Sequence, residues 1–218
     1  MSQNRTVAWT ITFAIGLLAS AGCAEMGHQQ AGGFSYQPFP VATGSGTAGD
    51  GQSVTFKGKP LAMTGGPGIK VGDSLREVKL AKTDLSLVSL TETKGKVRIV
   101  SIVPSLDTKV CEQQTHYLSE KNAGLDQGIE LITVSIDTPF AQSRFAKDAH
   151  IENVTFLSDY RGGDFGKTYG LLVKDVHILA RTVMVVDKEN VIRYLQITPE
   201  LAQMPDMEAA FNAARGLR

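Results

Sequence analysis

Cys111 is the residue best placed to do chemistry, because it follows an apolar segment and a proline. Residues 97–103 (VRIVSIV) are rich in β-branched side chains and predict a buried strand, which Pro104 ends. Asp107 or Thr108 can cap a helix that follows, so Cys111 falls in its first turn. Unpaired backbone N–H groups and the positive end of the helix dipole favour a charged sulfur there. The pattern therefore indicates a nucleophilic thiolate, with the Thr108 hydroxyl one turn earlier able to point at it.

The same residues match a known motif. The peroxidatic motif of peroxiredoxins is a proline, a threonine four residues later and a cysteine three residues after that, which is the spacing of Pro104, Thr108 and Cys111. A lone cysteine after a strand is more often a small core residue than a nucleophile, so the motif alone is weak support. The resemblance gives Pro104 the role of shielding the sulfur from water, which is compatible with its ending the strand.

The resemblance extends from about Val54 to the C-terminus. It is to bacterial thiol peroxidases, often described as atypical two-cysteine peroxiredoxins, and it includes residues 139–145 (PFAQSRF) and Arg181 within LARTV. It implies a thiol-dependent peroxidase for hydrogen peroxide or organic hydroperoxides. Cys111 would attack the peroxide while Thr108 and Arg181 donate hydrogen bonds to the reacting atoms. Without the resemblance, Arg181 would be interpreted as an exposed arginine at a strand end, paired with a carboxylate.

Ala146 is the main departure from the family pattern. In similar enzymes the resolving cysteine follows the phenylalanine equivalent to Phe145 and forms a disulfide with the peroxidatic sulfur, whereas this chain has Ala146 there. The only other cysteine is Cys23. The sequence therefore predicts a one-cysteine cycle in which an external thiol resolves the oxidised Cys111.

The expected fold class is α/β, a thioredoxin-like fold with an N-terminal β-hairpin and a central mixed sheet flanked by helices. A βαβ unit followed by an antiparallel hairpin and a last helix is the thioredoxin plan, and the resemblance implies the same fold. Strands are expected at residues 54–57, 61–64, 87–90, 97–103, 129–136, 155–157, 181–186 and 191–196, and helices or helical turns at 109–123, 140–149, 165–169 and 207–215.

Residues 1–23 resemble a bacterial export signal. One positive residue precedes an apolar stretch over 7–18, and small residues lead to Cys23. This arrangement resembles the lipobox of lipoproteins, in which the cysteine is the site of lipid attachment. The lipobox usually has leucine three residues before the cysteine, where this chain has Ser20. The alternative is an ordinary signal peptide cleaved before Gly22, which leaves Cys23 as a free thiol.

The sequence predicts three segments: the signal at 1–23, a glycine-rich flexible tether at 24–52 and a thioredoxin-like peroxiredoxin domain at 53–218. The expected location is the bacterial cell envelope, with the domain lipid-anchored to a membrane and facing the periplasm or the exterior. A soluble periplasmic or secreted protein is the alternative.

Composition excludes some partners. Lys+Arg and Asp+Glu both count 22, so there is no electrostatic case for binding nucleic acid. The four histidines show no ligand spacing, so no metal site is assigned, and no cofactor is expected. His116, one turn beyond Cys111, is expected to be a solvated helical side chain. Similar enzymes are homodimers, and the resemblance carries that expectation to this chain.

Two other function classes remain open at this point. Loss of the resolving cysteine is compatible with an envelope redox sensor or a partner-binding domain, in which Cys111 is oxidised without turnover. A thiol-disulfide oxidoreductase is disfavoured, because no second cysteine lies near Cys111 to form a C-x-x-C pair.

Overall fold

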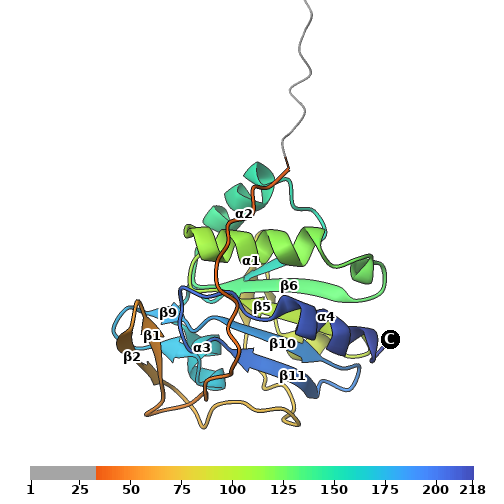
Figure 1. Cartoon of the computed structure of the whole chain (residues 1–218). Coiled ribbons are helices and arrows are strands. Elements are labelled where there is room, and N and C mark those ends of the chain that lie inside the picture. The colour runs from red at the N-terminus through yellow and green to blue at the C-terminus, as the bar shows by residue number, and fades with distance from the viewer. Residues whose placement is uncertain (1–32) are drawn as a thin grey trace, which may run out of the picture. The chain divides into compact units, whose positions relative to one another are not determined.

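The computed structural model describes residues 33–218, and it contains one long mixed sheet and one smaller sheet (Figure 1). The long sheet has seven strands in the order β11-β10-β5-β6-β7-β3-β4, and the smaller one has the order β1-β2-β8-β9. β5, β6 and β7 are parallel, whereas β10 is antiparallel to both β5 and β11. The strands are β1 (Ser53–Phe56), β2 (Lys59–Thr64), β3 (Leu80–Lys82), β4 (Leu87–Val88), β5 (Arg98–Ile102), β6 (Glu130–Ser135), β7 (Thr155–Ser158), β8 (Leu172–Val173), β9 (Ile178–Leu179), β10 (Thr182–Val186) and β11 (Ile192–Ile197).

Four α-helices are described, and two short 3-10 turns accompany them. The α-helices are α1 (Lys109–Glu120), α2 (Pro139–Asp148), α3 (Asp164–Tyr169) and α4 (Met207–Arg215), and the 3-10 turns are Leu90–Thr93 and Leu125–Gln127. The predicted thioredoxin-like arrangement of a mixed sheet with flanking helices and an N-terminal hairpin is confirmed. α1 ends three residues earlier than expected, because Ala123 and Gly124 have positive φ angles of 53° and 78°, which a right-handed helix excludes.

The long sheet has a core on each face, because its buried strands alternate their side chains. In β5, Ile99 belongs to the core beneath α1, α2 and α4, whereas Val100 belongs to the core shared with α3 and the smaller sheet. β10 repeats this alternation with Val183 and Met184. Apolar runs without polar alternation, which the sequence shows at 97–103, are typical of a strand covered on both faces.

An N-terminal arm, residues 34–48, crosses the side of the domain that carries α1 and the start of α4 (Figure 1). Its backbone is tied to the connection between β11 and α4. The Ala42 N–H donates to the Met204 carbonyl at 2.9 Å, and the Gly46 N–H donates to the Ile197 carbonyl at 2.7 Å. The arm is therefore an ordered part of the domain.

This arm corrects the expectation of a flexible tether over residues 24–52. The compact unit begins at Phe34, Phe39 packs against the core beneath the helices, and Ala42 and Ala48 are buried. The segment has few large apolar residues, which is typical of a linker, but Phe34 and Phe39 lie against the domain.

The predicted signal at 1–23, its lipid-attachment residue Cys23 and the tether up to residue 32 lie outside the described residues. Among the helices of residues 33–218, none is long and apolar enough to cross a membrane.

Candidate active site

Cys111 lies in the first turn of α1, as the sequence predicts. β5 ends at Ile102, Pro104 is buried directly after it, and a short loop leads to Thr108 at the N-cap of α1. Thr108 has an extended backbone, and its carbonyl accepts the first helical bond from the Glu112 N–H at 2.9 Å. The expected side-chain cap is absent, because the Thr108 hydroxyl is used elsewhere.

The Cys111 sulfur has two hydrogen-bond partners. The Thr108 hydroxyl lies 2.9 Å from it and Nη2 of Arg181 lies 3.3 Å from it. The same Thr108 oxygen is 3.1 Å from the Ser105 carbonyl, so its single proton can bind either the carbonyl or the sulfur. A charged sulfur draws this proton, because hydrogen bonds to ions are stronger than those to neutral acceptors. Thr108 and Arg181 thus lie where the sequence places them, on the sulfur.

Arg181 is held by neutral groups. Its Nε and Nη2 donate to the Leu201 carbonyl at 3.0 and 2.9 Å, and its Nη1 donates to Oε1 of Gln114 at 2.7 Å. All the acceptors recorded for this guanidinium within the described residues are uncharged apart from the sulfur itself. The alternative of an exposed arginine paired with a carboxylate is wrong, because Arg181 is 2% exposed. Its positive charge is therefore available to a thiolate.

Gln114 completes the support of Arg181. It lies three residues after Cys111 on α1, and its Nε2 donates to the Ser101 hydroxyl of β5 at 2.8 Å. Both Gln114 and Ser101 are fully buried. Gln114 is not among the site residues expected from the sequence, although its spacing from Cys111 places it on the same face of the helix.

The loop before Thr108 is held by Asp137, which follows β6. Its carboxylate accepts from the Ser105 hydroxyl and from the Leu106 N–H, each at 2.7 Å. Asp107 is exposed, and the capping role offered for it has no hydrogen bond to support it. Asp137 therefore fixes the backbone that carries the Ser105 carbonyl, which contacts the Thr108 hydroxyl, and it does so without touching the sulfur.

Ala146 lies on α2, and its side chain is partly buried against the core beneath the helices. Cys111 is the free cysteine among the described residues, and it is 0% exposed. No second thiol of residues 33–218 can therefore resolve an oxidised Cys111.

His116 differs from the expectation of a solvated side chain. It is buried, its Nδ1 lies 2.7 Å from Oε1 of Glu120, and its ring stacks on Phe34 of the arm with centroids 3.9 Å apart. The arm, which the sequence predicts to be a flexible tether, covers the His116 ring through Phe34.

Comparisons with known proteins identify the family of this chain. Residues 70–211 match the redoxin family. A thiol peroxidase of Halalkalibacterium halodurans is 43% identical over 163 residues, which are 75% of this chain and 97% of that protein. A thiol peroxidase of Streptococcus pneumoniae is 43% identical over 164 residues, which are 75% of this chain and 99% of that protein. About a quarter of this chain has no counterpart in these two relatives.

Comparison with solved structures also points to peroxidases of the peroxiredoxin type. The crystal structure of a peroxiredoxin-like protein from Aquifex aeolicus matches with a TM-score of 0.70 and 38% identity, covering 76% of this chain and 97% of that one. A thiol peroxidase from Chromobacterium violaceum shares the fold, with a TM-score of 0.64 and 21% identity over 75% of this chain and 95% of that one. The chain therefore belongs to the redoxin family, within the bacterial thiol peroxidases, and is a thiol-dependent peroxidase of the peroxiredoxin type.

Proposed function

We propose that this peroxidase reduces hydrogen peroxide or organic hydroperoxides in a one-cysteine cycle, with an external thiol as the reductant. The observation that carries the proposal is the Cys111 sulfur between two donors, the Thr108 hydroxyl at 2.9 Å and the Arg181 guanidinium at 3.3 Å. The single proton of the Thr108 hydroxyl can turn from the sulfur to a peroxide oxygen, and Nη1 of Arg181 carries a second proton besides the one donated to Gln114.

In the first step the Cys111 thiolate attacks one peroxide oxygen. A sulfur–oxygen bond forms, the oxygen–oxygen bond breaks, and the other oxygen leaves with the electron pair as hydroxide or alkoxide, which takes a proton to give water or an alcohol. Negative charge moves from sulfur to the leaving oxygen, so fixed donors at both positions lower the barrier. Pro104 is buried next to the loop that leads to Thr108, and the family resemblance gives it the role of limiting the access of water to the sulfur.

In the second step an external thiol attacks the Cys111 sulfenic acid. A mixed disulfide forms and water leaves, after which a second external thiol releases reduced Cys111 and an external disulfide. Ala146 supports this route, because the residue that would supply an internal thiol has none. The reductant belongs to the class of small or protein thiols.

We further propose that the protein works at a bacterial envelope membrane, held there by lipid on Cys23. The support is the sequence of residues 1–23, whose short apolar stretch and small residues precede that cysteine. Cleavage before Gly22, which gives a soluble envelope protein, is the alternative.

The deciding experiment compares the unaltered protein with Cys111→Ser and Cys23→Ser in a peroxide-consumption assay with dithiothreitol as the thiol. Cys111→Ser should consume no peroxide, because an alcohol remains protonated and is a poor nucleophile where the thiolate was a good one. Cys23→Ser is the control and should keep full activity. Retained activity in Cys111→Ser would refute the assignment.

The same assay separates the enzyme from the sensor interpretation. A catalyst consumes many equivalents of peroxide per Cys111 when the thiol is in excess. Consumption that stops after one equivalent would favour a redox sensor instead.

A further inference from the structure

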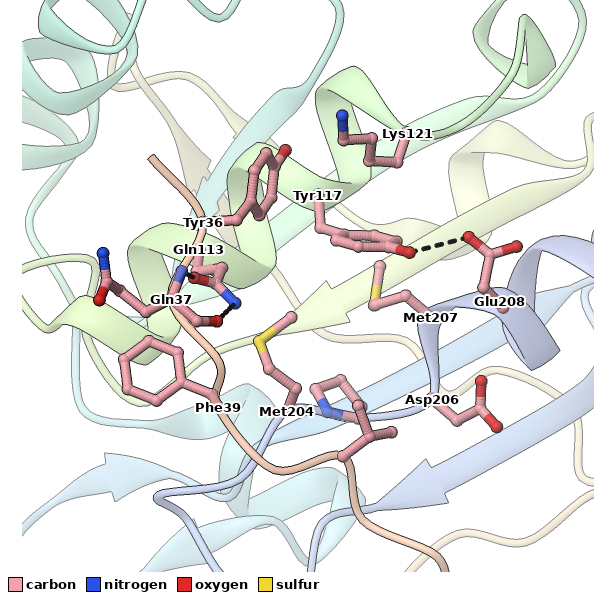
Figure 2. Close-up of a pocket in the computed structure, with 12 residues that line it drawn as sticks. Tyr36, Gln37, Phe39, Gln113, Tyr117, Lys121, Met204, Asp206, Met207 and Glu208 are labelled. Carbon is pink, nitrogen blue, oxygen red and sulfur yellow. Dashed lines mark hydrogen bonds between the residues drawn. The ribbon is translucent and has the colours of Figure 1, made fainter. Parts of the chain in front are cut away.

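The N-terminal arm contacts α1 along the helix face that follows Cys111. Gln113 and Gln37 are joined by two hydrogen bonds, from the Gln37 N–H to Oε1 of Gln113 at 2.6 Å and from Nε2 of Gln113 to the Gln37 carbonyl at 3.0 Å (Figure 2). The side-chain amide thus pairs with the arm backbone as a strand would. This pairing is two residues beyond the reacting sulfur, within the same turn of α1.

Two aromatic residues of the arm extend the contact along the helix. Phe34 stacks on His116 with an interplanar angle of 15°, and the Tyr36 hydroxyl donates to Oε2 of Glu120 at 2.8 Å. Burial and the neighbouring Glu120 carboxylate raise the pKa of Tyr36 above its ordinary value, so its hydroxyl stays protonated as a donor. The α1 residues contacted are spaced by three and four positions, so they form one stripe along the helix.

In the tip of the arm, Tyr36 also contacts the helix through its ring, which meets the Tyr117 ring with centroids 5.9 Å apart and lies 4.9 Å from the Lys121 ammonium. A cavity of about 290 Å3 lies between the arm, α1 and the start of α4, and its lining includes Tyr36, Phe39, Tyr117 and Met204 (Figure 2). The Gln37 backbone groups are at an exposed residue, so water can replace the Gln113 amide if the tip lifts. The remainder of the arm stays anchored through Ala42 and Gly46. The tip and the remainder of the arm therefore have separate attachments to the domain.

The buried sulfur makes this contact relevant to the reaction. Hydrogen peroxide is a small reactant, whereas an attacking thiol brings a larger sulfur with its own substituent. Cys111 is 0% exposed in the closed structure, so the first turns of α1 must open before a thiol can reach the sulfenic acid. Unwinding those turns moves Gln113 and breaks its pairing with Gln37.

We propose that the N-terminal arm is a clamp on α1, in which Gln113 and Phe34 are positioning residues that restrain the opening required for reduction of oxidised Cys111. This inference rests on the proposed one-cysteine function and concerns only its second step. The arm stabilises the closed state, from which hydrogen peroxide needs a smaller opening than a thiol does to reach the sulfur. It therefore slows attack by the external thiol, in which a sulfur–sulfur bond forms and water leaves.

The clamp has a second consequence. A sulfenic acid that stays beside Thr108 and Arg181 remains where a second peroxide is activated. That peroxide transfers one oxygen to the sulfur and leaves as water or alcohol, giving the sulfinic acid. Loosening the arm should therefore lower overoxidation while it speeds reduction.

The test uses Gln113→Ala and Phe34→Ala in the full chain, with Gln37→Ala as the matched control. Gln113→Ala removes both hydrogen bonds to the arm, whereas Gln37→Ala keeps them because they use its backbone. Cys111 is first oxidised with one equivalent of hydrogen peroxide, and dithiothreitol is then added while the sulfur state is followed by rapid-quench mass spectrometry.

Each loosening variant should be reduced about tenfold faster than the unaltered protein, which equals about 1.4 kcal/mol of opening free energy. The oxidation rate should stay within about twofold, and sulfinic acid should accumulate more slowly under excess peroxide. Backbone amides of residues 109–116 should exchange hydrogen faster in both variants. Gln37→Ala should match the unaltered protein in all four measurements.

Equal reduction rates in all four proteins, or faster reduction only with slower oxidation, would overturn the clamp. Failure of the proposed function would look different, because the unaltered protein would then consume no peroxide through Cys111. Phe34→Ala loosens the arm without changing a residue of α1. If both variants behave alike, the effect of Gln113→Ala is not caused by a general loss of helix structure.

Discussion

The environment of the Cys111 sulfur combines a hydroxyl donor with a cationic one. Thr108 is neutral and lies on the same helix terminus, whereas Arg181 brings positive charge from a distant part of the chain. Because Arg181 is buried among neutral acceptors, little else compensates its charge. Such fixed groups assist a reaction most when the charge that they stabilise moves during the step.

The first prediction concerns these two donors. Thr108→Val and Arg181→Ala should each lower the rate of Cys111 oxidation by peroxide at least tenfold, or about 1.4 kcal/mol of transition-state stabilisation. Stopped-flow kinetics under single-turnover conditions measures this rate. Thr115→Val is the matched control, because it removes a buried hydroxyl of α1 that bonds the Cys111 carbonyl and not the sulfur. An equal loss in the control would show that packing, and not donation to sulfur, is responsible.

The second prediction concerns Gln114, which orients Arg181. Gln114→Met should lower the oxidation rate about tenfold, because Nη1 of Arg181 loses its acceptor in a buried site. Ser101→Ala is the matched control and should keep more of the activity, because it removes the hydroxyl that accepts from Nε2 of Gln114 and leaves the acceptor of Arg181 in place. If both variants react alike, orientation of Arg181 by the Gln114 oxygen is not what matters.

At the scale of elements, the site depends on how α1 and α2 lie together. The Phe145 ring of α2 approaches the His116 ring of α1 with centroids 6.4 Å apart, so the two helices are neighbours. Ala146 follows Phe145 and packs partly against the same core. The helix position at which the family pattern has a resolving cysteine therefore exists in this structure, but its side chain is that of Ala146 and carries no thiol.

The third prediction uses this position. With one equivalent of peroxide the unaltered protein should accumulate Cys111 sulfenic acid, and excess peroxide should drive it to sulfinic acid, because residues 33–218 hold no second thiol to intercept it. Ala146→Cys should instead give a disulfide between positions 111 and 146, with slower overoxidation, after both helices open locally. Intact-mass and peptide-mass spectrometry distinguish the products.

Lys147→Cys is the control for this experiment, because it adds a thiol to an exposed neighbouring position of the same helix. An equally efficient disulfide from position 147 would show that α2 imposes no geometry. Detection of a Cys23–Cys111 disulfide within one unaltered chain would contradict both the lipid anchor and the one-cysteine cycle.

At the scale of the whole molecule, the described domain begins at Phe34 and the proposed anchor is at Cys23. Ten residues separate the two positions. This length of chain, if extended, spans at most about 35 Å. The domain would thus act close to the membrane surface, if the cysteine carries lipid.

The fourth prediction tests that attachment. Cys23→Ser should release the protein from membranes isolated from the producing cells, while peroxide consumption per molecule is unchanged, because residue 23 precedes the domain. Fractionation and intact-mass measurement give the location and any added lipid. An unaltered protein that is soluble and begins at Gly22 would show that ordinary signal cleavage is correct.

The sequence by itself determined the fold class and the local part of the site. Pro104, Thr108 and Cys111 lie within eight residues, so strand end, helix start and sulfur geometry follow from contiguous chain. The side-chain cap that the sequence predicts for Thr108 does not form, because the hydroxyl contacts the sulfur and the Ser105 carbonyl. Arg181 is 70 residues from the cysteine, so only its family motif links it to the site in the sequence.

The tertiary structure alone decided what surrounds these residues. The Leu201 carbonyl holds Arg181, yet a backbone carbonyl has no signature in a sequence, because every residue carries one. The arm resembles a linker by composition, and only the surface of α1 shows where Phe34 and the Gln37 backbone bind. Helix caps and dipoles act over a few neighbouring residues, whereas the packing of segments remote in sequence depends on the shape and exposure of the surfaces that meet.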